Sequence, residues 1–217
     1  MIRFAAIRQE VVDTCRYLAD HGYFAGTGGN IGVRLDAKLM AVTPSATDYY
    51  AMGPADVPII DIKTQTVVDG EMTPTVEKAL HACMIEAYPS RFASIHTHQP
   101  IASAVALLHE VLPWAPGIDC TSNGENVALI PYRPSGTSML AKAFGKTIRP
   151  NTYAYLMASH GVICSAENLA AATAMLRQIE QSAQFYLHKH IQQNTTLDKQ
   201  LRAFLSVALE KSKSKGA

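Results

Sequence analysis

The chain has 217 residues, of which 48% are hydrophobic and 17% are charged, and its formal net charge is +1. This composition excludes a disordered chain, and the nearly balanced charge gives no reason to expect a nucleic-acid or membrane partner. A chain of this length buries roughly 70% of its unfolded surface, so it needs no disulfide or structural metal to fold.

The N-terminal segment predicts an amphipathic helix rather than a signal peptide. Apolar residues recur every three or four positions over residues 2–21, and charged residues interrupt them throughout. No stretch reaches 18 uninterrupted apolar residues, so we expect no membrane span. The four cysteines are scattered without a CxxC pair, which favours free thiols. We therefore expect a cytoplasmic protein that ends in a frayed basic tail over 210–217.

Short strands and helices alternate along the rest of the chain. Four glycines within residues 26–32 end the first helix. A later helix is predicted to begin with Thr73 as its N-cap and Pro74 at its first position. The other predicted strands lie over 30–35, 39–45, 56–74 (one or two), 92–98, 126–132 and 153–166, and the other helices over 100–111, 135–148, 168–193 and 196–212. Because no regular βαβ rhythm appears, we expect one mixed α/β domain over 1–217.

Two histidines in the segment "SIHTH" are the first candidates for chemistry. His96 and His98 are separated by one residue on a predicted strand, so both side chains leave the same face. Neutral imidazoles in this arrangement suit a divalent metal ion, although an isolated pair is more often two histidines that bond to backbone or solvent.

Two further residues extend this set. His160, in "ASHGV", follows an apolar strand and precedes a glycine, where a turn can aim it into a cleft. Glu77 lies in the predicted first turn of its helix, and His81 follows it by one helical turn on the same face. Three histidines and one carboxylate form a donor set suited to zinc with an exchangeable position.

The glycine-rich stretch "GTGGNIG" is a candidate anion site. Its backbone N–H groups, with Thr27 and the Asn30 amide, can face a phosphate, although most glycine clusters are simply turns. It matches neither GxGxxG nor the P-loop motif. The segments "VTPSATD" and "TPT" supply further hydroxyl groups of the kind that binds phosphate.

These motifs resemble those of the class II aldolase/adducin family, in the same order and at similar separations. The segments are "GTGGNIGVR", "VTPSATD", "TPTVEKALH", "IHTH" and "LMASHGV", and the resemblance runs from about residue 8 to residue 190. It implies a single α/β domain with a largely antiparallel central sheet flanked by helices. It also implies a homotetramer with active sites at subunit interfaces.

The resemblance also implies roles for individual residues. His96, His98 and His160 match the family's zinc ligands, and Glu77 matches the acidic residue that completes the zinc site and serves as acid/base. Gly29, Asn30, Ser45, Ala46 and Thr75 match positions that hold the phosphate of the substrate. One Zn²⁺ per chain would then stabilise an enediolate formed when a carbon–carbon bond breaks.

The chain departs from the family's aldolases in the phosphate-binding residues and at the far end of the substrate. Val76 stands where a second serine is expected, Gly117 where an interfacial tyrosine is expected, and Ser135 where a phenylalanine is expected, whereas Tyr132 is retained.

We therefore expect a zinc-dependent lyase that cleaves a phosphorylated sugar or sugar acid by retro-aldol chemistry. The alternatives are a 3-oxo-tetronate 4-phosphate decarboxylase, a sugar-phosphate 4-epimerase and, last, a non-catalytic adducin-like binding module. The sequence leaves the substrate open.

Overall fold

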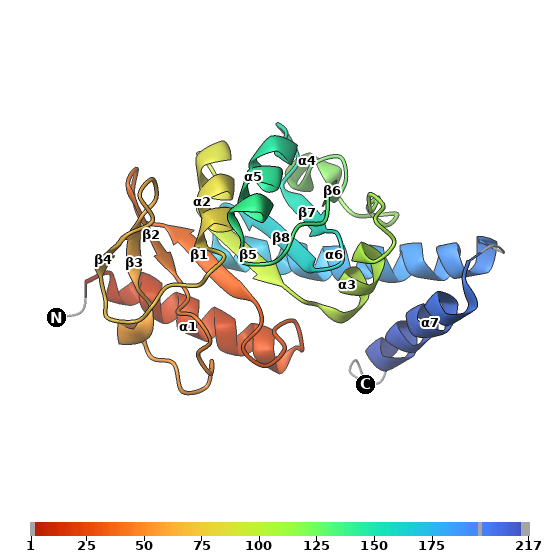
Figure 1. Cartoon of the computed structure of the whole chain (residues 1–217), viewed down its shortest axis with the longest axis horizontal. Coiled ribbons are helices and arrows are strands. Elements are labelled where there is room, and N and C mark those ends of the chain that lie inside the picture. Colours follow the sequence, from red (N-terminus) through yellow and green to blue (C-terminus); the bar gives the residue numbers. More distant parts are fainter. Residues whose placement is uncertain (1–2, 195–196, 214–217) are drawn as a thin grey trace.

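A computed structural model of the chain describes residues 3–194 and 197–213 (Figure 1). It contains one eight-stranded sheet with the strand order β4-β3-β2-β1-β5-β8-β7-β6. The strands are β1 (Asn30–Arg34), β2 (Leu39–Val42), β3 (Ile59–Asp61), β4 (Val67–Asp69), β5 (Ala93–Thr97), β6 (Ala128–Ile130), β7 (Ala154–Met157) and β8 (Gly161–Ala166). Only β6 and β7 pair in parallel, and the other neighbouring strands of the sheet are antiparallel. The expected single α/β domain with a largely antiparallel sheet is confirmed.

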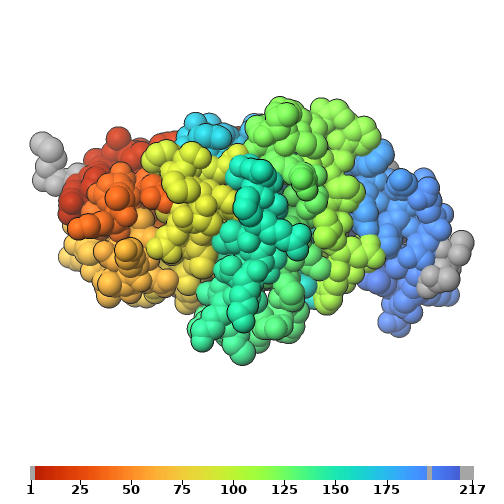
Figure 2. All heavy atoms as spheres, turned by 90° about the horizontal axis from the view of Figure 1, so that it is seen from above, coloured from red at the N-terminus to blue at the C-terminus, as the bar shows by residue number. Residues whose placement is uncertain are grey.

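Helices cover both faces of this sheet (Figure 1). The helices are α1 (Ala5–Asp20), α2 (Lys78–Ala87), α3 (Pro100–Ala106), α4 (Cys120–Asn123), α5 (Ser138–Thr147), α6 (Leu169–Gln193) and α7 (Lys199–Lys213), with a 3₁₀ turn at Pro54–Asp56. Helices α2 and α5 pack together on one face, where Figure 2 shows them side by side in yellow and blue-green. Helices α1, α3 and α6 pack on the other face, and α7 packs against α3 and α6.

Each face of the sheet has its own apolar core residues, because successive strand residues point to opposite sides. The larger core joins Ile31, Ile95, Val162 and Cys164 of the strands to the α1, α3 and α6 side. On the opposite face, one core joins Tyr155 and Ile163 to α2 and α5, and a separate core joins Met40, Val42 and Ile60 to α2. In β5, Ile95 therefore enters the larger core, while His96 and Ser94 face α2. This register decides which strand residues reach the functional site.

The predicted start of the second long helix is wrong. Residues 73–76 are not helical: Pro74 forms an antiparallel bridge with Pro44, and α2 begins only at Lys78, with Glu77 as its N-cap. Thr43 and Thr75 join the two segments, because the Thr75 N–H donates to the Thr43 carbonyl at 2.9 Å. Glu77 thus stands at the junction of an extended segment and a helix.

Two other sequence-based expectations concern the C-terminal half of the chain, where the structure refines both. The apolar segment 153–166 is a hairpin of β7 and β8, and His160 lies in its turn. Helix α7 runs to Lys213, so part of the expected tail over 210–217 is helical, and residues 214–217 lie outside the described residues. All four cysteines are free. Within the described residues, no helix combines the length and the apolar character that crossing a bilayer requires.

Candidate metal centre and active site

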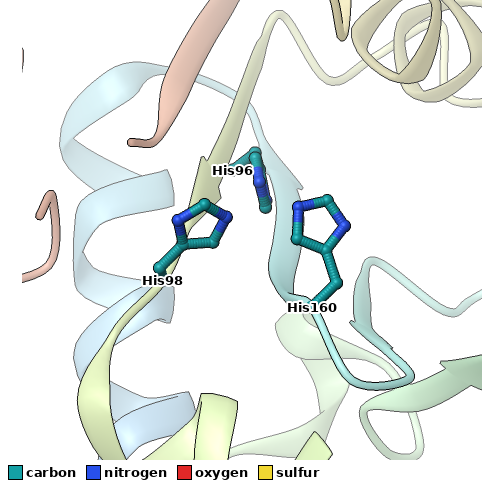
Figure 3. Close-up of side chains that lie close together, drawn as sticks. All are labelled: His96, His98 and His160. Carbon is teal, nitrogen blue, oxygen red and sulfur yellow. The ribbon is translucent and has the colours of Figure 1, made fainter. Parts of the chain in front are cut away.

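Three histidine side chains converge at the middle of the sheet (Figure 3). His96 belongs to β5, His98 follows that strand, and His160 comes from the β7–β8 turn. Antiparallel pairing of β5 with β8 sets His96 opposite Ile163, which brings the turn next to the end of β5. The ring centroids are 4.7, 4.8 and 5.1 Å apart, and one nitrogen from each ring lies within 4.8 Å of the other two.

Each of these rings has a buried nitrogen without a hydrogen-bond partner among the described residues. The atoms are His96 Nε2, His98 Nε2 and His160 Nδ1, although on His160 it is the other nitrogen, Nε2, that faces Glu77. His96 Nδ1 donates to the Val162 carbonyl at 2.7 Å, so its Nε2 carries a lone pair. A buried nitrogen left without a partner is unfavourable, whereas three neutral imidazoles around one point suit a cation.

Glu77 completes this donor set. Its Oε2 lies 3.2 Å from His96 Nε2, and its Oε1 lies 3.4 Å from His160 Nε2. An ionised oxygen facing the lone pair of His96 is repulsive unless a cation lies between them. Two ligands bonded to zinc at about 2.0–2.1 Å with tetrahedral angles are about 3.3–3.4 Å apart, which matches these separations. The residues therefore fit a divalent metal ion.

The charge states of the four groups support the same interpretation. Burial raises the pKa of Glu77, but His96, the Asn30 amide, His160 and the Ser135 hydroxyl together outweigh it and lower the pKa to about 2. Burial lowers the pKa of His96 to about 3, and burial also lowers those of His98 and His160. At neutral pH the site thus presents one carboxylate and three neutral imidazoles, which are the ligand forms.

Two glycines allow the imidazoles to approach the backbone. A Cβ atom at Gly161 would lie 2.5 Å from the Thr97 carbonyl oxygen and 2.7 Å from His98 Cδ2. A Cβ atom at Gly28 would lie 2.9 Å from His98 Nδ1. Gly161 is the residue after His160, so the same turn that presents one histidine leaves room for another.

The predicted phosphate-binding residues lie on three segments that come together beside Glu77. The Ile31 N–H donates to Thr43 Oγ1, the Ser45 N–H donates to the Thr73 carbonyl at 2.8 Å, and the Glu77 N–H contacts Thr75 Oγ1 at 3.3 Å. Gly29 and Asn30 therefore lie near Ser45, Ala46 and Thr75 at one end of β1.

Individual members of this group differ in exposure and conformation. Ala46 adopts φ 52°, in the left-handed region that favours glycine. Gly29, at φ 103°, has the Phe24 ring where a side chain would begin, at 2.2 Å from a Cβ position. Thr27 and Ala46 are exposed, whereas Gly29 and Thr75 are buried.

Asn30 is engaged differently from the sequence-based expectation that its amide faces a phosphate. Its Nδ2 donates to Glu77 Oε2 at 2.9 Å, and its Oδ1 contacts His81 Nε2 at 2.6 Å. The amide therefore supports the carboxylate.

Three polar residues at the site were missed or left without a role. The Ser135 hydroxyl donates to Glu77 Oε1 at 2.9 Å, although the sequence marked it only as a departure from the family. Tyr49 donates to the carbonyls of Gly29 and Thr27, at 2.6 and 3.2 Å, and so holds the glycine-rich turn. Ser94 bonds to His81. A hydroxyl in a strand or loop carries no sequence signal that distinguishes it, so only the fold could reveal these contacts.

Comparison with known proteins decides the family. The model of the class II aldolase and adducin N-terminal domain matches residues 9–187. The chain belongs to this family. The predicted recognition is confirmed, and the class of carbon–carbon lyases is confirmed through relatives that are named aldolases.

The similar proteins include enzymes of sugar-phosphate metabolism. The chain is 34% identical over 180 residues to the 5-deoxy-D-ribulose 1-phosphate aldolase of Bacillus thuringiensis serovar kurstaki, covering 82% of this chain and 83% of the relative. It is 26% identical to the L-fuculose phosphate aldolase of Haemophilus influenzae, covering 84% and 83%.

Among solved structures, an L-fuculose 1-phosphate aldolase superposes with a TM-score of 0.81 at 29% identity, covering 98% of both chains. The L-fuculose-1-phosphate aldolase of Thermus thermophilus shares the fold, with a TM-score of 0.72 at 19% identity and coverage of 88% and 98%.

Proposed function

We propose that this member of the family is a zinc-dependent aldolase that cleaves a ketose 1-phosphate. The observation that carries the proposal is the Glu77 carboxylate facing neutral His96 and His160, at separations that fit ligands of one ion. The names of the relatives support sugar phosphates as substrates. A non-catalytic binding module would have no need of this donor set.

Retro-aldol cleavage requires proton transfers at two carbons of the substrate. The C4 hydroxyl loses its proton, the C3–C4 bond breaks, and its electron pair moves toward the C2 carbonyl, after which C3 accepts a proton. A bound zinc ion would supply the positive charge that stabilises the enediolate. His96, His98 and His160 would hold that ion, with Glu77 as an exchangeable fourth ligand.

Glu77 is ionised in the free site, so we propose that it takes up a proton as the substrate binds and delivers that proton to C3, while the proton of the C4 hydroxyl leaves to water. Its two oxygens accept hydrogen bonds from Asn30 and Ser135, so the carboxylate keeps its orientation without the metal. We propose that these donors aim one oxygen at the reacting carbon. Burial of the carboxylate, which is 6% exposed, limits exchange of that proton with bulk water.

The substrate phosphate would bind at the end of β1. Backbone N–H groups of Gly29 and Ala46 and the hydroxyls of Thr27, Ser45 and Thr75 are the proposed donors, because these segments meet beside Glu77. A phosphate there stands next to the metal ligands, as a ketose 1-phosphate requires of its C1 and C2 groups.

The opposite end of the substrate would face an apolar surface. Tyr132, in the loop after β6, and Met139, at the start of α5, are 54% and 52% exposed. Such a surface suits a deoxygenated sugar tail, as in the substrate named for the Bacillus relative. We also propose that a second copy of this chain covers part of it in a homotetramer. We propose a cytoplasmic location as well, which free cysteines support.

Metal content and cleavage activity test this proposal together. Purified protein is analysed for zinc before and after chelation, and 5-deoxyribulose 1-phosphate and fuculose 1-phosphate are offered as substrates. We expect about one zinc per chain, and release of dihydroxyacetone phosphate that stops on chelation and returns with zinc. Light scattering gives the oligomeric state. Zinc binding without cleavage of any ketose 1-phosphate would contradict the aldolase, and absence of zinc binding would contradict the metal centre.

A further inference from the structure

His81 is a buried histidine next to the site that the proposed mechanism does not use. It lies in α2, one turn after Glu77, and its side chain is fully buried. Its Nδ1 lies 2.9 Å from Ser94 Oγ, and its Nε2 lies 2.6 Å from Asn30 Oδ1. Both ring nitrogens are therefore engaged, and neither faces the metal site.

Gly32 keeps the ring close to the sheet. A Cβ atom at Gly32 would lie 2.6 Å from His81 Cβ and 2.8 Å from Cγ, so only glycine in β1 lets α2 approach this closely. Ser94 in β5 and Asn30 in β1 then bracket the ring from two neighbouring strands. The imidazole is fixed by packing as well as by its two hydrogen bonds.

The direction of each hydrogen bond follows from the charge of Glu77. An ionised carboxylate only accepts, so Asn30 must turn its amide N–H toward Oε2 and its carbonyl oxygen toward His81. His81 must then carry its proton on Nε2, which leaves Nδ1 to accept from the Ser94 hydroxyl. Burial lowers the pKa of His81 to about 4, which is consistent with a neutral ring.

We propose that His81 is a positioning residue for the aldolase reaction: in its Nε2–H form, set by Ser94, it locks the Asn30 amide so that Asn30 holds Glu77 Oε2. This inference rests on the proposed function, because its effect on catalysis passes through Glu77. Without the His81 donor, the Asn30 carbonyl oxygen loses its partner and nothing else fixes the position of the amide that donates to Glu77. The Glu77 oxygen then loses its fixed direction, although the three histidines keep theirs.

The state of the ring can be measured without any activity assay. Protein labelled with ¹⁵N-histidine and freed of metal is examined by NMR, in which protonated and unprotonated ring nitrogens have well-separated shifts. We expect His81, assigned by its loss in a variant, to be protonated at Nε2 and unprotonated at Nδ1 at neutral pH. A proton on Nδ1 instead would overturn the inference.

Kinetics test the positioning role. His81→Phe keeps an aromatic ring but removes both contacts, and we expect kcat to fall by about 10- to 100-fold while KM and zinc content change less than about twofold. His81→Gln retains a donor for Asn30 and should return kcat to within about threefold of wild type. His21→Gln, at the exposed end of α1, is the matched control and should change nothing.

The outcomes separate this inference from the proposed function. A wild-type protein that cleaves no ketose 1-phosphate contradicts the aldolase, whatever His81 does. An active wild type with an equally active His81→Phe variant contradicts the positioning role alone. Equal losses in the Phe and Gln variants, or a loss of zinc in both, would show that His81 acts only through packing and would also overturn it. Where His81→Phe does not fold, as judged by circular dichroism, the NMR result on wild type decides.

Discussion

Replacing Gly161 by alanine tests whether the three histidines hold a metal in the geometry described above. The new Cβ atom would lie 2.5 Å from the Thr97 carbonyl oxygen, and real Cβ contacts essentially never fall below 3.0 Å. The β7–β8 turn or the end of β5 must therefore move by about 0.5 Å. Zinc sites tolerate deviations of about 0.2 Å in their ligand distances. The displacement should spoil the ligand set without removing a ligand.

Gly161→Ala should change both the affinity for zinc and the thermal stability of the protein. Zinc affinity, measured by competition with a chromophoric chelator, should fall by about tenfold or more, as it does when the support of a ligand is disturbed. Overpacking a buried site costs about 1–3 kcal/mol. For a chain of this size that lowers the Tm of the metal-free protein by about 2–12 °C.

A matched glycine serves as the control. Gly145 lies in α5, and a Cβ atom there meets nothing within 4 Å, so Gly145→Ala should leave zinc affinity unchanged and raise the Tm slightly. Wild-type zinc affinity in Gly161→Ala, with its Tm lowered as expected, would refute the argument that the backbone at this turn positions the metal ligands.

Three further predictions concern single side chains. His98→Ala removes one imidazole and should abolish stoichiometric zinc by elemental analysis, while the chelated protein keeps its circular dichroism spectrum because that side chain holds no part of the core. Ser135→Ala removes the donor to Glu77 Oε1 and should lower kcat by about 3- to 10-fold in the cleavage assay, because one ordinary hydrogen bond is lost. An unchanged kcat would show that this hydrogen bond does not contribute to catalysis. Asp69→Asn leaves the buried Arg8 without its ion-pair partner and should lower the free energy of unfolding in urea by about 2–3 kcal/mol, less than for a fully buried pair because Asp69 is partly exposed.

The clustering of the three histidines could be predicted in part, because sequence spacing constrains where two of them point. His96 and His98 share a strand face in any pairing of β5, and His160 beside a glycine at a strand end indicates a turn. The start of α2 was not predictable in this way. Thr73 and Pro74 form a good N-terminal signal, but the pairing of Pro74 with Pro44 competes with it and wins, because extended residues there hold two segments of the site together. The helix propensity of residues 73–76 cannot reveal that Pro74 pairs with Pro44, which lies 30 residues away in the sequence.

Asn30 shows the other limit of sequence reasoning. Its amide in a glycine-rich stretch suggested an anion site, and its neighbours do lie beside the proposed phosphate donors. Which way a buried amide faces depends on residues far along the chain, namely Glu77 at the start of α2 and His81 within it. The sequence marked Ser135 only as a departure from the family for the same reason, since a serine in a proline- and glycine-containing loop is ordinary until the fold brings Glu77 to it. The hydrogen bonds that Asn30 and Ser135 make to Glu77 can therefore be recognised only in the three-dimensional structure.

The location of the loop over residues 131–137 has a consequence for the evolution and engineering of this enzyme. The loop leaves β6, the outermost strand at one edge of the sheet, whereas the histidines come from β5 and from the turn into β8, at its centre. Insertions or exchanges in the loop would leave the central strand pairing intact. We therefore expect exchanges in this loop to affect the proposed contacts with the sugar tail more than the proposed metal site, to which the loop connects where Ser135 donates to Glu77 and Gly136 approaches Val76. A graft of this loop from a relative, with serine kept at position 135, should change the substrate preference while the three histidines keep their arrangement.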